Sequence, residues 1–232
     1  MINISQRLAR IASFVPVGVR VADIGSDHAY LPIYLVQRGI AVQAIAGEVN
    51  EGPFLGAERN VRSHGLKESI SVRHGNGLAV LTAGEVDAIT VSGMGGGTIR
   101  EILANGIDKL EGVARLILSP QGDGDSLRRW LIEHGWQIVD EDMLEEDDKI
   151  YEIVVAERGE MVLADPLALE FGPLLLQRKH PLILARAEYE LSKITLALKG
   201  LENARGESGQ ARRDALQQRR KQLEEVQAHV RS

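Results

Sequence analysis

Residues 19–31 read VRVADIGSDHAYL, and this stretch decides the fold. The apolar run Val19–Ile24 has the length and composition of a buried strand. Gly25 then permits a tight turn, and the small Ala29 lets a helix beginning near Tyr30 lie close to the strand. A strand, a glycine turn and a helix in this order predict the opening unit of a parallel α/β sheet.

Strand and helix patterns continue to alternate on both sides of this unit. Further strands are expected at 42–46, 70–73, 88–91 and 116–118, and helices at 4–15, 30–38, 53–64, 98–103 and 126–134. The short links between them predict a doubly wound sheet with helices on both faces. Residues 136–143 and 150–156 predict a final antiparallel pair. We expect the acidic run Asp140–Asp148 in a solvated connection, because burying so much charge is costly.

After Gly159 the pattern becomes purely helical, so we divide the chain into domains at 1–160 and 161–232. Apolar residues at heptad spacing in the second part predict a helical hairpin or a short coiled coil. Residues 1–176 carry 15 Lys/Arg and 26 Asp/Glu, whereas residues 177–232 carry 12 Lys/Arg and 7 Asp/Glu. The basic tail can attract a polyanion to an acidic body, or its charges can be the solvated faces of a helical pair.

Composition excludes several classes of protein. The chain has 232 residues, 44% of them hydrophobic, which is too many for a disordered chain and enough for a substantial core. It has no cysteine, so thiolate catalysis, disulfides and cysteine zinc sites are excluded. The six histidines show no ligand pairing, so no metal site is expected. With no long apolar window and no secretory leader pattern, we expect a cytoplasmic protein that does not bind membranes.

The loop after the first strand carries two acids instead of the glycines of a dinucleotide site. Asp23 and Asp27 would repel a pyrophosphate, whereas they suit a positively charged ligand. S-adenosylmethionine carries a sulfonium and an ammonium and no phosphate, so this loop favours it over NAD. The candidate cofactor-binding residues in this loop are Asp23, Gly25, Ser26, Asp27 and His28.

The loops after the next three predicted strands add further candidates. Glu48, followed by Val49, has two oxygens that match a ribose diol. The loop after the third strand contains Gly75, Asn76, Gly77 and Leu78, which offer an acceptor and an apolar wall for adenine. The loop after the fourth strand contains Ser92, Gly93, Met94 and Gly95, where the backbone can approach both the cofactor and the substrate. Each loop alone also has a purely structural interpretation, as a turn, a solvated strand end or a linker. Their shared position after successive strands is the specific signal.

With these motifs the sequence resembles the bacterial tRNA (adenine-22-N1)-methyltransferases. The likeness is carried by ADIGSDHAYLP (22–32), IAGEVNEGPF (45–54), NVRSHG (60–65), 73–81, VDAITVSGMGG (86–96) and IYEIVVAE (150–157). It implies a Rossmann-like seven-stranded methyltransferase fold with a C-terminal helical coiled-coil domain that contacts tRNA. It also implies transfer of a methyl group from S-adenosylmethionine to N1 of adenine 22, with S-adenosylhomocysteine as product. The chain departs from the family pattern at Gly75-Asn76-Gly77, where Gly-Asp-Gly is usual, and at 119–123.

The resemblance suggests roles for the candidate catalytic residues. N1 of neutral adenine has a lone pair and needs no base, so positioning and stabilisation of the developing charge matter most. We assign the stabilising role to Asp27, helped by the carbonyls of Gly93, Met94 and Gly95, although Asp27 can instead bind the cofactor ammonium. His28 and Tyr30 can stack on the displaced base or simply pack locally.

Phosphate contacts are assigned to cations of the tail and of the first helix. The tail candidates are Arg178, Lys179, Arg186, Arg212, Arg213, Arg219, Arg220 and Lys221, and Arg7 and Arg10 on the first helix are either additions to this basic surface or ordinary solvated charges. We expect a monomer or a weak homo-oligomer. The alternatives are an NAD-dependent oxidoreductase, a non-catalytic RNA-binding protein, and a methyltransferase acting on another RNA, on DNA or on protein.

Overall fold

The structure is a computed structural model that describes residues 1–163, 165–201 and 207–232. The chain divides into two compact units, Met1–Glu170 and Phe171–Ser232, and each is described by itself.

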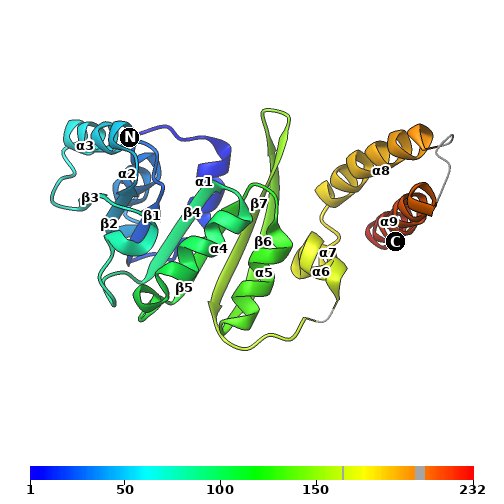
Figure 1. Cartoon of the computed structure of the whole chain (residues 1–232). Coiled ribbons are helices and arrows are strands. Elements are labelled where there is room, and N and C mark those ends of the chain that lie inside the picture. Colours follow the sequence, from blue (N-terminus) through cyan, green and yellow to red (C-terminus); the bar gives the residue numbers. More distant parts are fainter. Residues whose placement is uncertain (164, 202–206) are drawn as a thin grey trace. The chain divides into compact units, whose positions relative to one another are not determined.

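The first unit is built on a seven-stranded sheet in the order β3-β2-β1-β4-β5-β7-β6 (Figure 1). The strands are β1 (Val19–Ile24), β2 (Ala41–Glu48), β3 (Ile70–His74), β4 (Ala88–Met94), β5 (Arg115–Pro120), β6 (Trp136–Glu146) and β7 (Lys149–Arg158). The first five strands are parallel, and β7 runs antiparallel to both β5 and β6. The predicted Rossmann-like, seven-stranded sheet with an antiparallel edge is confirmed.

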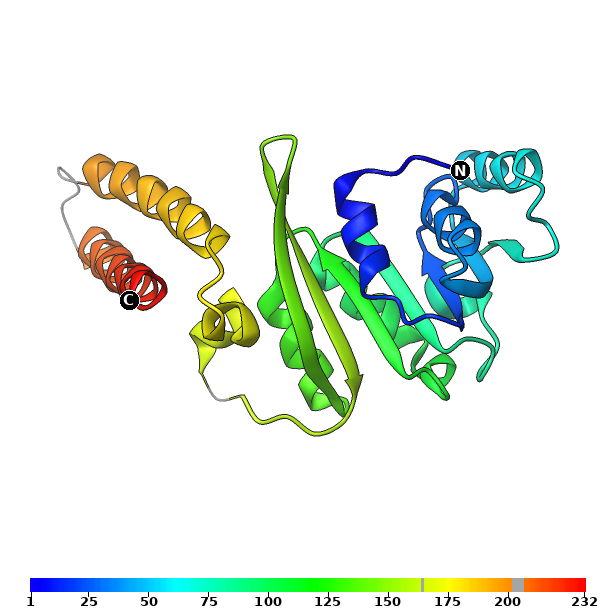
Figure 2. The same cartoon turned by 180° about the vertical axis from the view of Figure 1, so that it is seen from behind.

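Helices cover both faces of this sheet. They are α1 (Gln6–Ser13), α2 (Tyr30–Gln37), α3 (Glu51–Ser63), α4 (Gly96–Asn105) and α5 (Gly124–Glu133), with single 3-10 turns η1 (Gly77–Val80) and η2 (Ile107–Leu110). Figure 1 shows α4 and α5 on one face, and Figure 2 shows α1, α2 and α3 on the other. Ser5 caps α1, because its hydroxyl accepts the Leu8 N–H. The β1–β4 pair lies at the centre, so loops after these two strands meet at one edge.

The acidic run forms part of a strand, and two of its acids are buried. β6 continues through Glu146, and the hairpin turn consists only of Asp147 and Asp148, both at positive φ. The expected solvated connection is therefore wrong for Asp142, which is 9% exposed, and for Glu141, which is 1% exposed. Sequence reasoning missed its partner Arg128 on α5, whose Nε lies 2.6 Å from the Glu141 carboxylate.

Arg128 links three elements of the first unit from a fully buried position. Its guanidinium also pairs with Glu152 on β7 and donates to the Leu169 carbonyl at 3.0 Å. Burial by itself lowers the pKa of Arg128, but the charges of Glu152 and Glu141 and their hydrogen bonds raise it above its ordinary value. The cluster keeps α5 in place against the antiparallel edge of the sheet.

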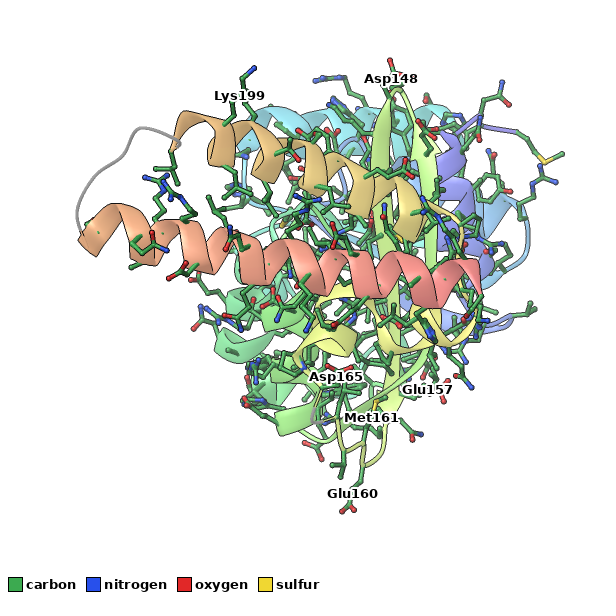
Figure 3. The ribbon with its side chains drawn as sticks, turned by 90° about the vertical axis from the view of Figure 1, so that its right-hand side faces the viewer. Asp148, Glu157, Glu160, Met161, Asp165 and Lys199 are labelled. Carbon is green, nitrogen blue, oxygen red and sulfur yellow. The ribbon has the colours of Figure 1, made fainter. Side chains whose placement is uncertain are left out.

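The second unit is helical. It contains α7 (Pro173–Gln177), α8 (Leu182–Gly200) and α9 (Glu207–Arg231), while α6 (Pro166–Phe171) spans the division between the units. Figure 3 shows α8 and α9 side by side. Their buried residues are Ile183, Ala187 and Ile194 on α8 and Leu223, Val226 and Val230 on α9. The predicted helical C-terminal region is confirmed. No helix in the described part of the chain combines the length and apolar character needed to cross a membrane.

Replacing Arg128 by alanine should destabilise the protein by about 3–5 kcal/mol, because it leaves two carboxylates without their buried partner. Its neighbour Arg129 is exposed on the same helix, and Arg129→Ala should change stability by less than about 0.5 kcal/mol. Urea unfolding of both variants measures the difference. Equal stabilities would show that the buried cluster contributes nothing net.

Candidate functional site

Asp23 is a carboxylate buried at the carboxyl end of β1, where it is 3% exposed. The hydroxyls of Ser26 and Thr90 each donate to it at 2.6 Å. Burial raises the pKa of Asp23 to about 6 and the charge of Glu48 adds to this, while the two hydroxyl donors and the charge of Arg7 act in the opposite direction. A cation bound beside Asp23 would offset the cost of its burial.

The loop that follows has an unusual backbone. Asp27, His28 and Ala29 have φ angles of 40°, 67° and 59°, a left-handed conformation that costs free energy for each non-glycine residue. Two long-range hydrogen bonds hold it. The Asp27 N–H donates to the Glu48 carboxylate, and the Asn60 side chain donates to the His28 carbonyl at 2.9 Å. The strain fixes the loop against the end of β2, where Glu48 is the last residue.

A cavity of about 460 Å³ opens at the same edge of the sheet. Of the predicted cofactor-binding residues, it brings together Gly25, Val49, Gly75, Asn76, Gly77 and Leu78, and Met94 of the predicted catalytic set also lines it. Gly25 has a φ of 70°, and a Cβ there would collide with the Met94 methyl group. Glycine is therefore required at this point for both conformation and space.

One wall of the cavity was missed by sequence reasoning. It consists of Thr98, Glu101, Ile102 and Asn105 on α4, with Gly106, Asp108 and Lys109 beyond the helix. The four α4 positions follow the 3-4 spacing of a single helical face, and this periodicity was the available signal. The sequence pattern did not distinguish this cavity-lining face of α4 from a helix face that packs against the core.

Other predicted residues lie outside the cavity lining. Two of them bond to lining residues through the backbone: the Glu48 carbonyl accepts the Gly75 N–H at 2.8 Å, and the Ser26 N–H donates to the Gly47 carbonyl at 3.2 Å. Asp23 and Asp27 bond in turn to Ser26 and Glu48. His28, Tyr30, Ser92, Gly93 and Gly95 do not line the cavity. The Asp27 side chain is 80% exposed, and its Oδ1 lies 3.6 Å from Nε2 of His28. The rings of His28 and Tyr30 are 5.9 Å apart. These side chains are therefore placed beside the cavity.

Several predicted phosphate-binding cations are engaged within the second unit. Arg219 and Arg186 both contact Glu190, at 2.7 and 3.7 Å. Arg220 pairs with Glu224 at 2.7 Å, and Arg213 donates to the Leu201 carbonyl at 2.7 Å. Arg220 is exposed and the other three cations are partly buried. Contacts of this kind near the surface contribute little stability, so a phosphate can compete for these cations. Among the described residues, no group of three possible metal ligands comes together.

The residues present suit S-adenosylmethionine. The raised pKa of Asp23 reflects a buried acid in need of a positive neighbour, which an ammonium or a sulfonium would supply. Glu48, at the end of the adjacent strand, is placed for a ribose diol. The cavity between Val49 and Leu78 has apolar walls for a purine.

Asp23→Asn should make the ligand-free protein more stable above pH 6. The unfolded carboxyl ionises near about pH 4, whereas the folded one retains its proton to about pH 6, so the wild type loses stability as pH rises through this interval. Asparagine has no such cost, and its advantage should reach on the order of 2 kcal/mol at pH 7. Urea unfolding from pH 4 to 8 measures it. A stability difference that is independent of pH would contradict the assignment.

Comparison with known proteins identifies the family of the chain. The family model tRNA (adenine(22)-N(1))-methyltransferase (TrmK) matches residues 21–227. The enzyme of that name from Bacillus subtilis (strain 168) is 47% identical over 195 residues, 82% of this chain and 82% of the relative.

Solved structures extend the comparison. A Streptococcus pneumoniae protein in complex with S-adenosyl-L-methionine has 45% identity and a TM-score of 0.88, over 97% of this chain and 99% of that one. TrmK of M. capricolum in complex with S-adenosyl-homocysteine has 29% identity and a TM-score of 0.82, over 98% of this chain and 97% of that one. The chain belongs to the tRNA (adenine(22)-N(1))-methyltransferase family.

Proposed function

We propose that this protein transfers a methyl group from S-adenosylmethionine to N1 of adenine 22 in tRNA. In a chain of this family, the observation that carries the proposal is the pair of buried acids at the ends of neighbouring strands, Asp23 of β1 and Glu48 of β2. This pair selects a positively charged nucleoside and disfavours a dinucleotide diphosphate. Thus an NAD-dependent oxidation is the weaker alternative.

Different residues of the site bind different parts of the cofactor. Asp23, held by Ser26 and Thr90, faces the positive end, and Glu48 accepts the ribose hydroxyls. Asn76 and Leu78, in the loop after β3, provide an amide acceptor and an apolar surface for adenine. Asn76 keeps the acceptor oxygen of the aspartate usual in the family but not its charge.

The bound cofactor supplies an electrophilic methyl group, which leaves sulfur as a bond to adenine N1 forms. The chain must hold N1 in line with that bond and stabilise the positive charge that develops on the ring. Asp27 is suited to this, because its exposed carboxylate can accept a hydrogen bond from the exocyclic amine. Of the backbone carbonyls predicted as further acceptors, those of Met94 and Gly95 already accept the N–H groups of Gln121 at 2.8 Å and Ile99 at 3.0 Å, so the Gly93 carbonyl is the better placed of the three.

His28 and Tyr30 form the platform for the target base. Their rings are neighbours, and Tyr30 is 40% exposed, so an aromatic face is open for stacking. The position of the His28 ring depends on Gly56 of α3, where a Cβ would collide with Nδ1 of that histidine. N1 lies on the pairing edge of adenine, so the nucleotide must leave its pair before it reaches this platform.

The basic residues of the second unit hold the tRNA backbone. The first unit is acidic and would repel a polyanion, so the tail provides the opposite field. Binding should weaken as salt concentration rises. A cytoplasmic location and a monomeric or weakly associating protein are part of the same proposal.

The decisive experiment combines the purified protein, unmodified tRNA transcript and labelled S-adenosylmethionine, followed by mapping of the modified base. We expect N1-methyladenine at position 22 and no labelling of a transcript with guanine there. Label at another site or in another macromolecule would overturn the substrate assignment. Thermal stabilisation by NAD but not by S-adenosylhomocysteine would overturn the cofactor assignment as well.

Asp27→Asn separates the two possible roles of this carboxylate. If it stabilises the adenine, kcat should fall at least about tenfold, since a charge-assisted hydrogen bond to a cationic ring is lost, while affinity for S-adenosylhomocysteine changes less than about twofold. Single-turnover rates and calorimetric titration measure the two quantities. Weakened binding of S-adenosylhomocysteine with unchanged single-turnover rate at saturation would assign Asp27 to the cofactor.

A further inference from the structure

The side chain of Arg7 occupies the edge of the sheet between α1, β4 and β7. Its guanidinium carbon lies 4.9 Å from the centre of the Tyr151 ring. One terminal nitrogen lies 3.6 Å from where a Cβ on Gly93 would be. The charge of Arg7 also acts on Asp23 at the end of β1. Arg7 therefore borders the place that the target nucleotide must enter.

The helix that carries Arg7 is anchored to the β6–β7 hairpin. The Gln6 N–H donates to the Glu146 carboxylate at 2.6 Å, and Arg10 pairs with Asp142. Figure 2 shows α1 alongside the long hairpin. These contacts fix the backbone on both sides of Arg7 and therefore the position from which its side chain extends.

The hydrogen-bonding state of Arg7 differs from that of its neighbour Arg10. The Nε of Arg7 is buried and has no hydrogen-bond partner among the residues that the structure describes, whereas the Nε of Arg10 is occupied by Asp142. A buried N–H without a partner costs free energy and is uncommon in folded proteins. The cost is explained if an acceptor arrives with a ligand.

The chemistry of that acceptor follows from the surrounding charges. Asp23, on which the charge of Arg7 acts, is acidic and would repel a phosphate, whereas Arg7 would attract one. A guanidinium presents its donors in a planar fork that matches two phosphate oxygens. Tyr151 holds this plane by a cation–π contact.

We propose that Arg7, supported by Tyr151, binds a backbone phosphate next to the target adenosine and positions the base beside Gly93. The inference rests on the proposed function, because it takes the acceptor to be a nucleic acid. Arg7 is a positioning residue, since it acts on the phosphate and not on the reacting atoms.

The test compares Arg7→Gln with Arg129→Gln, which removes the same charge from the exposed side of α5 and breaks none of the contacts that hold α1. Arg7→Gln should raise KM for tRNA about tenfold, and the slope of log K against log salt should become shallower by about 0.7–0.9, the value of one phosphate contact. Affinity for S-adenosylhomocysteine should change less than twofold. Arg129→Gln should leave the slope at its wild-type value. Arg7→Lys should give the wild-type salt slope, because it keeps the charge, but its KM for tRNA should lie between those of the wild type and Arg7→Gln.

Tyr151 provides an independent arm. Tyr151→Phe keeps the ring under the guanidinium and should behave as wild type, whereas Tyr151→Leu should raise KM for tRNA several-fold. The inference is overturned if Arg7→Gln keeps the wild-type salt slope, or if it weakens S-adenosylhomocysteine as strongly as tRNA. Wild-type protein that binds tRNA but never methylates N1 of an adenine would instead overturn the proposed function, since the salt slope is measured by binding alone.

Discussion

The site depends on a carboxylate that is kept away from water at the end of a central strand. Asp23 has two hydroxyl donors and no bonded cation, and the second acid of the site, Glu48, ends the strand beside it. Parallel register produces this arrangement, because Asp23 pairs with Ala46 and the following residues of β1 and β2 stay side by side. Acids on adjacent strands must then share one edge, and their repulsion is relieved only when a proton or a cationic ligand is present.

The first unit also contains a buried charge of a different kind, one that is fully paired within the protein. Arg128 is as inaccessible as Asp23, but it carries its own partners, Glu141 and Glu152. A cluster whose charges are all paired within the protein stabilises one arrangement of α5 and the β6–β7 hairpin, and it has no unpaired charge that a ligand could bind. Asp23, with hydrogen bonds but without a bonded counter-charge, is the kind of group expected at a binding site. A buried charge therefore does not by itself indicate a binding site. A buried charge that lacks a bonded counter-charge does.

Local patterns in the sequence were sufficient for the sheet and for the loops that end its strands. Strand and helix positions followed from apolar runs and glycines, and Gly25, Asn76 and Leu78, which were predicted in loops after successive strands, line one cavity. Long-range pairing was not accessible in this way: the charge of Glu141 is neutralised by a residue 13 positions earlier, on another element. The left-handed turn at Asp27–Ala29 was equally hidden, because tertiary hydrogen bonds to Glu48 and from Asn60 impose it.

Adenine N1 attacks with a lone pair that is already free, so the acceptor side of the site needs no group that titrates near neutral pH. In the proposed assignment, Asp23, whose pKa is raised by burial, belongs to the cofactor side, and the exposed Asp27 belongs to the acceptor side. Catalysis on the acceptor side must then come from positioning of the base and from acceptors for the charge that develops on it. Arg7 and the strained loop around His28 are fixed by contacts to the hairpin and to α3 respectively, so the two sides of the acceptor position are set by different parts of the fold. Rate should consequently respond to changes in the β6–β7 hairpin, far along the chain from the residues that bind the cofactor.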